Sequence, residues 1–133
     1  MEGGVENPET IVAYWKNSAD ADFITMQHLL ASGDFHWALF IGHLVLEKLL
    51  KACFVSRHKK HALFTHDLLR LAEKSGVEPT DEISNWLDEI STFHLNARYD
   101  NYKQDFYKRA NREFTDIWVT RITTIREWLM QKL

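Results

Sequence analysis

Apolar residues recur every three or four positions along most of the chain, which is the spacing of amphipathic α-helices. The first such stripe is formed by Val12, Trp15, Ala19, Phe23, Met26 and Leu30. The last, within residues 111–132, is formed by Phe114, Ile117, Trp118, Ile122, Ile125, Trp128 and Leu129. Between them, residues 35–55 are apolar nearly all round, which is typical of a helix buried on most sides.

Capping residues indicate where these helices begin and end. Asn7-Pro8-Glu9 has the order of a helix start. Gly33 predicts the end of that helix, and Asp34 predicts the cap of the next. Thr65-His66-Asp67 opens a short third helix that ends at Ser75-Gly76.

The remaining segments complete the predicted architecture. A fourth helix opens at Pro79–Glu82, whereas Asn96–Lys108 has no clear period and predicts a loop with some helical turns. Long helices joined by short connections pack as antiparallel neighbours. We therefore predict an all-α fold, an antiparallel four-to-five-helix bundle of residues 11–133 that follows an N-terminal tail of residues 1–10.

Composition supports this fold and narrows the class of protein. The 133 residues fit one domain, and five Gly with two Pro are too few for many strands and tight turns. Five Trp and eight Phe favour a large core or a protein interface, so we expect a homodimer. We also expect a cytoplasmic protein without membrane contact, because no signal-peptide pattern opens the chain and no apolar run reaches ~20 residues.

Charge is distributed unevenly along the chain. Residues 1–97 carry eight Lys or Arg against fourteen Asp or Glu, a net charge of −6. Residues 98–133 carry eight against five, a net charge of +3. A mildly basic C-terminal part suits an acidic partner or a phosphate, but the imbalance is too small to indicate general nucleic-acid binding.

A polar strip interrupts the apolar surface of the second helix. His36, His43, Glu47 and Lys51 project within an arc of about 80°, and Phe40 lies inside it. Glu47 and Lys51 also have the spacing of a favourable i,i+4 ion pair. Two interpretations stay open: the strip is the solvated edge of a core helix, or it is a dimer or ligand interface anchored by Phe40.

Three short motifs occur in a fixed order. They are Glu47-Lys48-Leu49-Leu50-Lys51-Ala52, then Thr65-His66-Asp67-Leu68, then Asn96-Ala97-Arg98-Tyr99. In this order the chain resembles the HEPN domains. The resemblance implies a dimeric helical bundle, often encoded beside a minimal nucleotidyltransferase in a toxin–antitoxin-like pair. It also implies that metal-independent endoribonuclease activity is common among relatives, with an Arg followed by a His after four to six residues.

The sequence departs from that ribonuclease motif. Lys103, Gln104 and Asp105 stand at the positions after Arg98 where the resemblance would require His. Asp100 stands where the short motif usually continues with Pro, and His43 stands where Gln is common. An enzyme of the usual kind is therefore not expected, and the weak catalytic candidates are Arg98, His66 and His94.

Candidate binding residues gather after the fourth helix. Arg98 offers a guanidinium for a phosphate, and Tyr99 offers a ring on which a base can stack. Lys103 and Arg109 lie among aromatic residues nearby, and Lys51 on the polar strip completes the nucleotide- or RNA-binding candidates. The alternative is a surface Arg and a packed Tyr in an ordinary loop.

Metal and cofactor chemistry is not indicated. No His-x-x-x-His pair is joined by Cys or a carboxylate at a convincing spacing, so no metal and no cofactor are predicted. Cys53 stands in an apolar run and is expected to be a buried, inert thiol.

Three functional hypotheses follow. The first is a non-catalytic, dimeric HEPN-type partner of a nucleotidyltransferase with a nucleotide or RNA site. The second is an endoribonuclease with a displaced arrangement that uses Arg98 with His66 or His94. The third is a purely structural interaction module.

One charged residue falls inside an apolar stripe. Arg121 projects onto the core-facing side of the last helix, so it must reach the bundle edge or meet an acid. We expect it to be at least half buried with its stem on aromatic rings, either along Trp118 and Trp128 or paired with Asp22 or Glu47. A phosphate-binding role is the third alternative.

Overall fold

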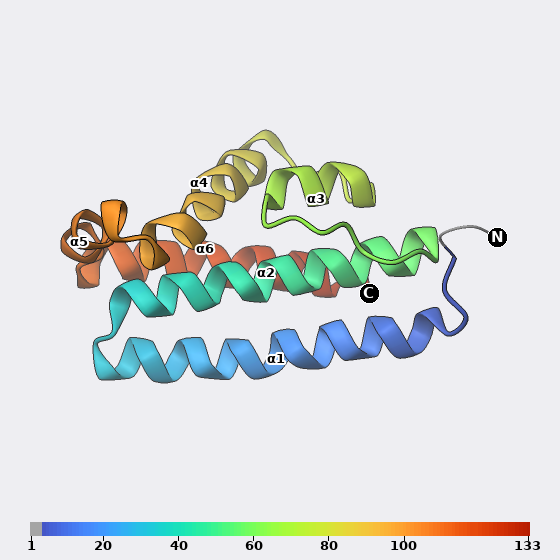
Figure 1. Ribbon diagram of the computed structural model, residues 1–133, viewed down its shortest axis with the longest axis horizontal. Helices are drawn as coiled ribbons and strands as arrows, with labels where there is room; N and C mark the ends of the chain where they lie inside the picture. The colour runs from blue at the N-terminus through green and yellow to red at the C-terminus, as the bar shows by residue number, and fades with distance from the viewer. Residues whose placement is uncertain (1–3) are drawn as a thin grey trace.

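The computed structural model describes residues 4–133 and contains six α-helices in that range. They are α1 (Pro8–Ser32), α2 (Phe35–His58), α3 (Leu68–Ser75), α4 (Asp81–Arg98), α5 (Asp100–Arg109) and α6 (Arg112–Met130). Helices α1 and α2 form a long antiparallel hairpin, and α6 lies beside α2 (Figure 1). Helices α3 to α5 lie on the side of α2 that faces away from α1. The prediction of an all-α bundle is therefore confirmed.

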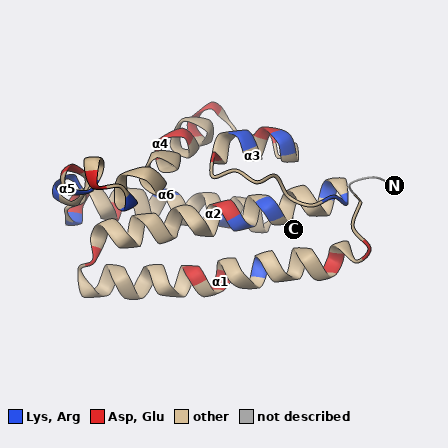
Figure 2. Ribbon diagram, in the orientation of Figure 1, with Lys and Arg blue, Asp and Glu red and all other residues tan. Residues whose placement is uncertain are grey.

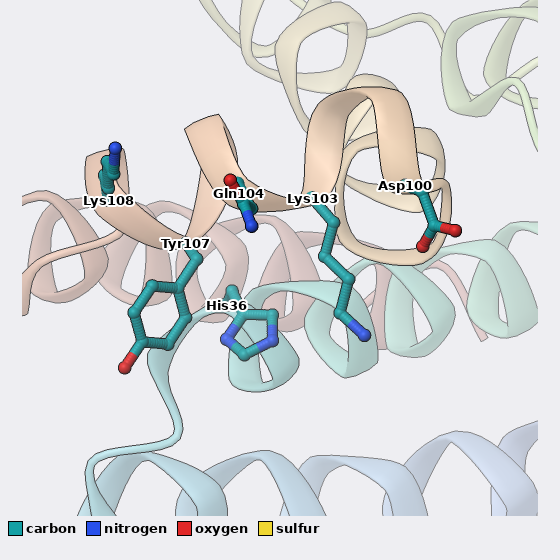
Figure 3. Close-up of a pocket in the computed structure, with 6 residues that line it drawn as sticks. All are labelled: His36, Asp100, Lys103, Gln104, Tyr107 and Lys108. Atoms are coloured by element: carbon teal, nitrogen blue, oxygen red, sulfur yellow. The ribbon is translucent and has the colours of Figure 1, made fainter.

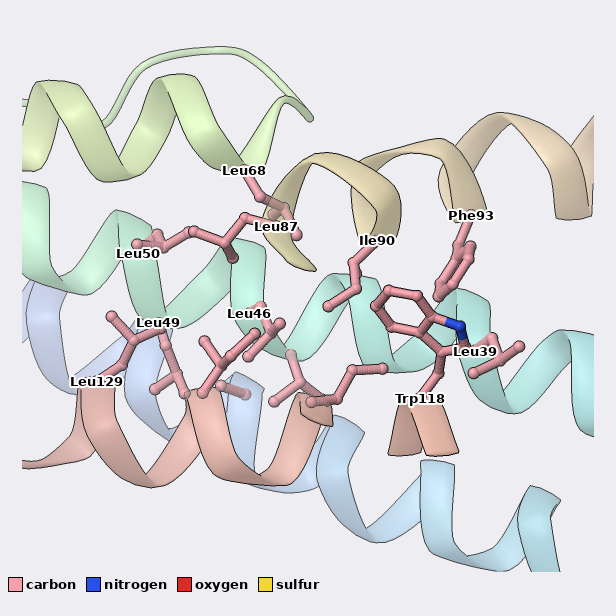
Figure 4. Packing of buried hydrophobic residues seen from close by; sticks show 14 of the residues in the cluster. Leu39, Leu46, Leu49, Leu50, Leu68, Leu87, Ile90, Phe93, Trp118 and Leu129 are labelled. Atoms are coloured by element: carbon pink, nitrogen blue, oxygen red, sulfur yellow. The ribbon is translucent and has the colours of Figure 1, made fainter. Parts of the chain in front are cut away.

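Helix α2 is the centre of the bundle, because α1, α3, α4, α5 and α6 all pack against it. Its leucines face the core residues of α4 and α6 in a continuous cluster, among them Leu87, Ile90, Phe93, Trp118 and Leu129 (Figure 4). Leu39, Leu46, Leu49 and Leu50 are fully buried, as the sequence of an almost wholly apolar helix predicts. This central position means that the buried polar side chains of α2 must find partners inside the protein.

The capping residues stand where the sequence placed them, although not all use their side chains. Gly33 ends α1 in the left-handed region, at a φ of 83°, where glycine carries no steric penalty. Asp67 and Thr80 accept backbone hydrogen bonds at the starts of α3 and α4. Asn7 and Asp34 make no such bond, and Asp34 instead accepts a hydrogen bond from Ser32 Oγ at 2.6 Å.

The predicted loop at 96–108 is wrong, because this segment is helical. Helix α4 continues to Arg98, the chain bends at the extended residue Tyr99 (φ −96°, ψ 131°), and α5 follows at once. The sequence pattern hides α5 because Phe106 is its one buried residue. A ten-residue helix with a single core contact shows no apolar stripe.

The start of the chain is tied to the end of α2. The Val5 N–H donates to the Lys59 carbonyl at 3.0 Å, and Gly4 bridges to Lys60. Helix α1 already begins at Pro8, within the range predicted as a tail, and residues 1–3 of that tail lie outside the described residues.

No helix within residues 4–133 combines the length and the apolar character needed to cross a membrane. Burial raises the pKa of the Cys53 thiol to about 11, in line with an inert cysteine.

Arg121 is partly buried and lies on aromatic rings, as predicted, but on a different pair. Its guanidinium carbon is 4.6 Å from the centroid of Trp118 and 5.2 Å from that of Trp86. The expected contact with Trp128 is wrong, since that ring lies under Lys132. The expected ion pair is also wrong, because Asp22 binds Lys48, and Glu47 binds Lys51 and His66.

Candidate functional site

The polar strip of α2 lies inside the protein. His43, Glu47 and Lys51 are at most 7% exposed, and His36 is also buried. The segment before α3 and the second half of α4 cover the middle of this face, while Tyr107 of α5 lies against His36 and Trp15 of α1 lies against Lys51. The strip is therefore neither a solvated edge nor an open interface in this chain. Phe40, the expected interface anchor, packs against the rings of His94 and Trp37. Figure 2 shows an acidic and a basic stretch of α2 next to each other in the middle of this helix.

Glu47 connects the polar groups of this buried seam, which consists of His43, Glu47 and Lys51 on α2 together with His66. Its Oε2 accepts from Lys51 Nζ at 3.0 Å, and its Oε1 accepts from His66 Nδ1 at 2.7 Å. Burial alone would raise the pKa of Glu47, but the hydrogen bonds from His66 and Lys51 outweigh burial and the net shift is downward. Glu47 is therefore a carboxylate at neutral pH. Its partner Lys51 has a second contact, because Lys51 Nζ lies 5.2 Å from the centroid of the Trp15 ring.

Hydrogen bonds to α2 and α4 hold the loop that precedes α3. The Leu68 N–H donates to Ser91 Oγ on α4 at 2.9 Å, and Asp67 caps α3 by accepting from the Arg70 N–H. His43 Nε2 lies 2.9 Å from the His66 carbonyl, and because a carbonyl oxygen only accepts, Nε2 is the donor. These bonds hold the His66 backbone between α2 and α4.

Three imidazoles meet in this place. His66 stacks on His94 with 4.0 Å between centroids, and His43 lies 5.2 Å from His94. Burial, assisted by the neighbouring His66, His43 and Arg98, lowers the pKa of His94 to about 4. Burial also lowers the pKa of His43. Both rings are neutral at pH 7, which lets them pack closely without charge repulsion.

Arg98 is attached to this cluster at its solvent-facing side. Its Nη1 donates to His94 Nε2 at 3.0 Å, and its guanidinium also lies over the ring of Tyr99. The bond needs an unprotonated Nε2, which agrees with the lowered pKa of His94. Beside it is a hollow of about 420 Å³, lined by residues of α4 and the loop that include His66, His94, Leu95 and Tyr99 together with the carboxylates of Asp67 and Asp88.

The geometry allows two kinds of chemistry. A guanidinium oriented by one neutral acceptor keeps its other N–H groups for a phosphate. His66 donates from Nδ1 to a buried carboxylate, while its side chain is 50% exposed, so its Nε2 is the nitrogen left for a ligand. Together they can bind a phosphodiester and move a proton.

The structure brings some predicted residues together and separates others. The weak catalytic candidates Arg98, His66 and His94 form one cluster, joined by Tyr99. Lys103 lies over the Trp37 ring in a second hollow, and Arg109 lies over Phe106 and Phe114. Lys51 is buried in its pair with Glu47. The binding candidates therefore line several places and not one surface.

The fold and the buried seam define a small helical-bundle protein whose polar groups gather where α2, α4 and the segment before α3 meet. The family model of the HEPN domain matches residues 12–133, so the chain belongs to the HEPN family. Among solved structures, TT1696 from Thermus thermophilus is similar, with a TM-score of 0.80 and 18% identity over 92% of this chain and 98% of that chain. At this identity the likeness shows the fold alone. No curated protein matches the sequence.

Proposed function

We propose that this HEPN protein is the dimeric partner of a nucleotidyltransferase in a toxin–antitoxin-like pair, and that it binds RNA through Arg98. The hydrogen bond of 3.0 Å between Arg98 and His94 carries the proposal. An exposed arginine side chain normally samples many rotamers. The hydrogen bond to His94 restricts the rotamers of Arg98, so less conformational entropy is lost when its guanidinium binds a phosphate. An oriented guanidinium at the edge of a hollow is suited to a phosphodiester.

The surroundings of Arg98 suit single-stranded RNA. Tyr99 is half exposed, and the stacked rings of His66 and His94 form part of the wall of the hollow. Unpaired bases stack on such rings, and sequence-tolerant RNA binding uses this contact together with phosphate contacts.

Exposed apolar side chains support a protein partner and a dimer. Phe64, in the segment between α2 and α3, is fully exposed, and Leu95 and Tyr102 on α4 and α5 are about half exposed. Large apolar side chains in solvent are typical of protein interfaces when they cluster. A dimer should bury on the order of 1,200 Å² or more in total. Sedimentation equilibrium at tens of micromolar tests this, and a single monomeric species would refute it.

RNA binding is tested by fluorescence anisotropy with a labelled single-stranded RNA. Arg98→Ala should weaken binding about tenfold and lower the slope of log affinity against log salt by about 0.7, one phosphate contact. Arg70→Ala, which removes an exposed arginine of α3, is the matched control. It should leave both the RNA affinity and the slope of log affinity against log salt nearly unchanged. Equal losses in the two variants would contradict a specific role for Arg98.

We expect a minimal nucleotidyltransferase gene beside the gene for this protein, and co-expression of the two products tests the partnership. A complex should survive affinity purification and gel filtration, and Phe64→Ser or Tyr102→Ser should reduce its yield if either side chain lies in the interface. Failure of both proteins to co-elute, with each one folded, would refute the pairing.

Endoribonuclease activity is the second candidate, favoured by one specific observation. Glu47 orients His66 through Nδ1, as a carboxylate does for a general base, and Arg98 lies on the neighbouring His94. RNA cleavage without metal should then be lost in His66→Gln and in Arg98→Ala but kept in His28→Gln, an exposed histidine of α1. If neither binding nor cleavage of RNA is found, the interaction module is the remaining function.

A further inference from the structure

The face of α1 that points away from α2 carries a regular stripe of exposed side chains, called here the outer stripe. Its members recur at intervals of three and four residues and are Tyr14, Asn17, Ala21, Ile24, His28 and Ala31. Tyr14 is 64% exposed and Ile24 is 55% exposed. Because a helix turns by about 100° per residue, the buried residues of α1 project to the opposite side, and they are Ala19, Phe23 and Met26.

The outer stripe carries no charge. None of its six members is Lys, Arg, Asp or Glu, and Figure 2 shows no such residue in the second half of α1. The two acids beside the stripe are paired within the chain, Asp20 with Arg126 Nη2 at 3.3 Å and Asp22 with Lys48 Nζ at 2.6 Å. Like charges that meet across an interface cost free energy, so a face without charge can meet its own copy. A partner recognised by its charge finds no counter-charge on this stripe.

The spacing of the outer stripe is that of a heptad repeat, the pattern with which two helices pack along their length. From Tyr14 to Ala31 the stripe is about 25 Å long. An antiparallel pair of α1 helices, with its two-fold axis midway between Ala21 and Ile24, would place Ala21 against the partner's Ile24. The same axis would place Tyr14 against the partner's Ala31. A large side chain then faces a small one in each of these layers, which fills the space between the helices without overpacking.

The polar members of the stripe match in the same register. Asn17 would lie against the partner's His28, and an amide can hydrogen-bond to an imidazole in either tautomer because it offers both donors and an acceptor. A parallel pair would instead place Tyr14 against the partner's Tyr14 and Ala21 against the partner's Ala21. The bulky layers would then hold the small layers apart. The order of residues along the stripe therefore favours the antiparallel arrangement.

We propose that the outer stripe of α1 pairs antiparallel with α1 of a second copy of this chain. The pairing goes beyond the proposed dimer, whose exposed apolar side chains belong to α4, α5 and the segment before α3. Figure 3 shows the start of α2 between α5 and α1, so both faces can be occupied at once. A protomer with two separate self-complementary faces joins two dimers into a tetramer.

Sedimentation equilibrium tests the pairing. One pair of helices forms a small interface, so the measurement uses protein at about 100 μM, where we expect a tetramer. Ile24→Glu puts a carboxylate against the partner's Ala21 and should halve the mass. Ile117→Glu is the matched control, because Ile117 is a 46% exposed isoleucine of α6, and it should leave the mass unchanged. Circular dichroism establishes that both variants are folded.

Disulfide trapping tests the antiparallel register. Under mild oxidation an equimolar mixture of the Ala21→Cys and Ile24→Cys variants should form mainly the mixed disulfide, because only these two positions face each other across the axis. Cys53 is 1% exposed and does not compete. Faster formation of the disulfide between two Ala21→Cys chains would show a parallel pair and overturn the proposed register.

Equal masses of the Ile24→Glu and Ile117→Glu variants would overturn the inference, even if both are dimers and the proposed dimer stands. Loss of a complex with the nucleotidyltransferase in Ile24→Glu, without loss of self-association, would also overturn it, because the stripe would then serve a different protein. If Ile24→Glu yields monomers, the α1 pairing stands and the separate dimer contact of the proposed function fails.

Discussion

The imidazole of His66 stacks on that of His94 at 4.0 Å between centroids and 20° between planes, although the two rings come from a loop and from α4. With His43 5.2 Å from His94, a third imidazole lies in the same place. Close imidazoles repel when they are charged, and burial adds a desolvation penalty. The cluster therefore makes the fold sensitive to acid.

Stability should fall as the pH is lowered from 6.5 toward 4. The folded pKa of His94 is depressed to about 4, so the unfolded chain takes up a proton in this window while the folded chain does not. The loss is at most about 3 kcal/mol from His94, and the lowered pKa of His43 acts in the same direction. Glu47, also with a lowered pKa, contributes stability that is lost only below its unfolded pKa, as the pH falls through its folded pKa.

Urea denaturation at pH 7, 6 and 5 measures this acid sensitivity. His94→Gln keeps an acceptor for Arg98 but removes the titrating ring, so the midpoints of this variant should change less with pH. His28→Gln, on the exposed side of α1, should keep the slope of the unaltered protein. Equal midpoints at pH 7 and pH 5 in the unaltered protein would contradict the argument.

Glu47→Gln should destabilise the protein at pH 7. The substitution keeps the shape but removes the charge that Lys51 and His66 share, and Lys51 is left as a buried ammonium without a counter-ion. We expect a loss of about 2–4 kcal/mol in the free energy of unfolding. Glu73→Gln, at an exposed position of α3, is the control and should change the free energy of unfolding by less than about 0.5 kcal/mol. A Glu47→Gln protein as stable as the control would show that the seam is solvated.

Much of the fold follows from local signals in the sequence. Gly33 and Asp67 mark helix ends because a left-handed residue and a capping carboxylate act within one turn. The position of α2 at the centre follows from its apolar residues. Helix α5 does not follow, because Phe106 alone faces the core and one residue defines no period.

The site could be predicted only where its contacts are local. The Glu47–Lys51 pair is an i,i+4 contact, and the sequence indicates it. His94 and Arg98 have the same spacing, but ending the fourth helix before Asn96 hid their bond. The contact of His66 with Glu47 spans 19 positions and depends on how the loop crosses α2, which no pattern along the chain records.

Gly42 is a close-packing position between three helices, and Gly42→Ala should test it. A methyl group there would lie 2.7 Å from Ile122 Cδ1 and 3.1 Å from Met26 Sδ. Overpacking opposes the gain of about 1 kcal/mol in helix propensity, and we expect a net loss of about 1 kcal/mol. Adding Ile122→Val removes the clashing carbon, so the alanine should be neutral or stabilising in that background. Additive effects in the double-mutant cycle would show that Ile122 moves aside without cost.

Arg121→Ala tests how a charged residue is accommodated in the apolar stripe of α6. Its guanidinium lies over Trp118 and Trp86, so the variant loses the cation–π contacts and the packing of the stem. We expect a loss of about 1–2 kcal/mol and a change in tryptophan fluorescence, since two of the five indoles change their surroundings. Arg121→Met keeps most of the stem and removes the charge, so its loss measures the cation–π attraction apart from packing. If alanine and methionine variants both melt like the unaltered protein, neither the packing of the stem nor the cation–π contacts of Arg121 stabilise this face.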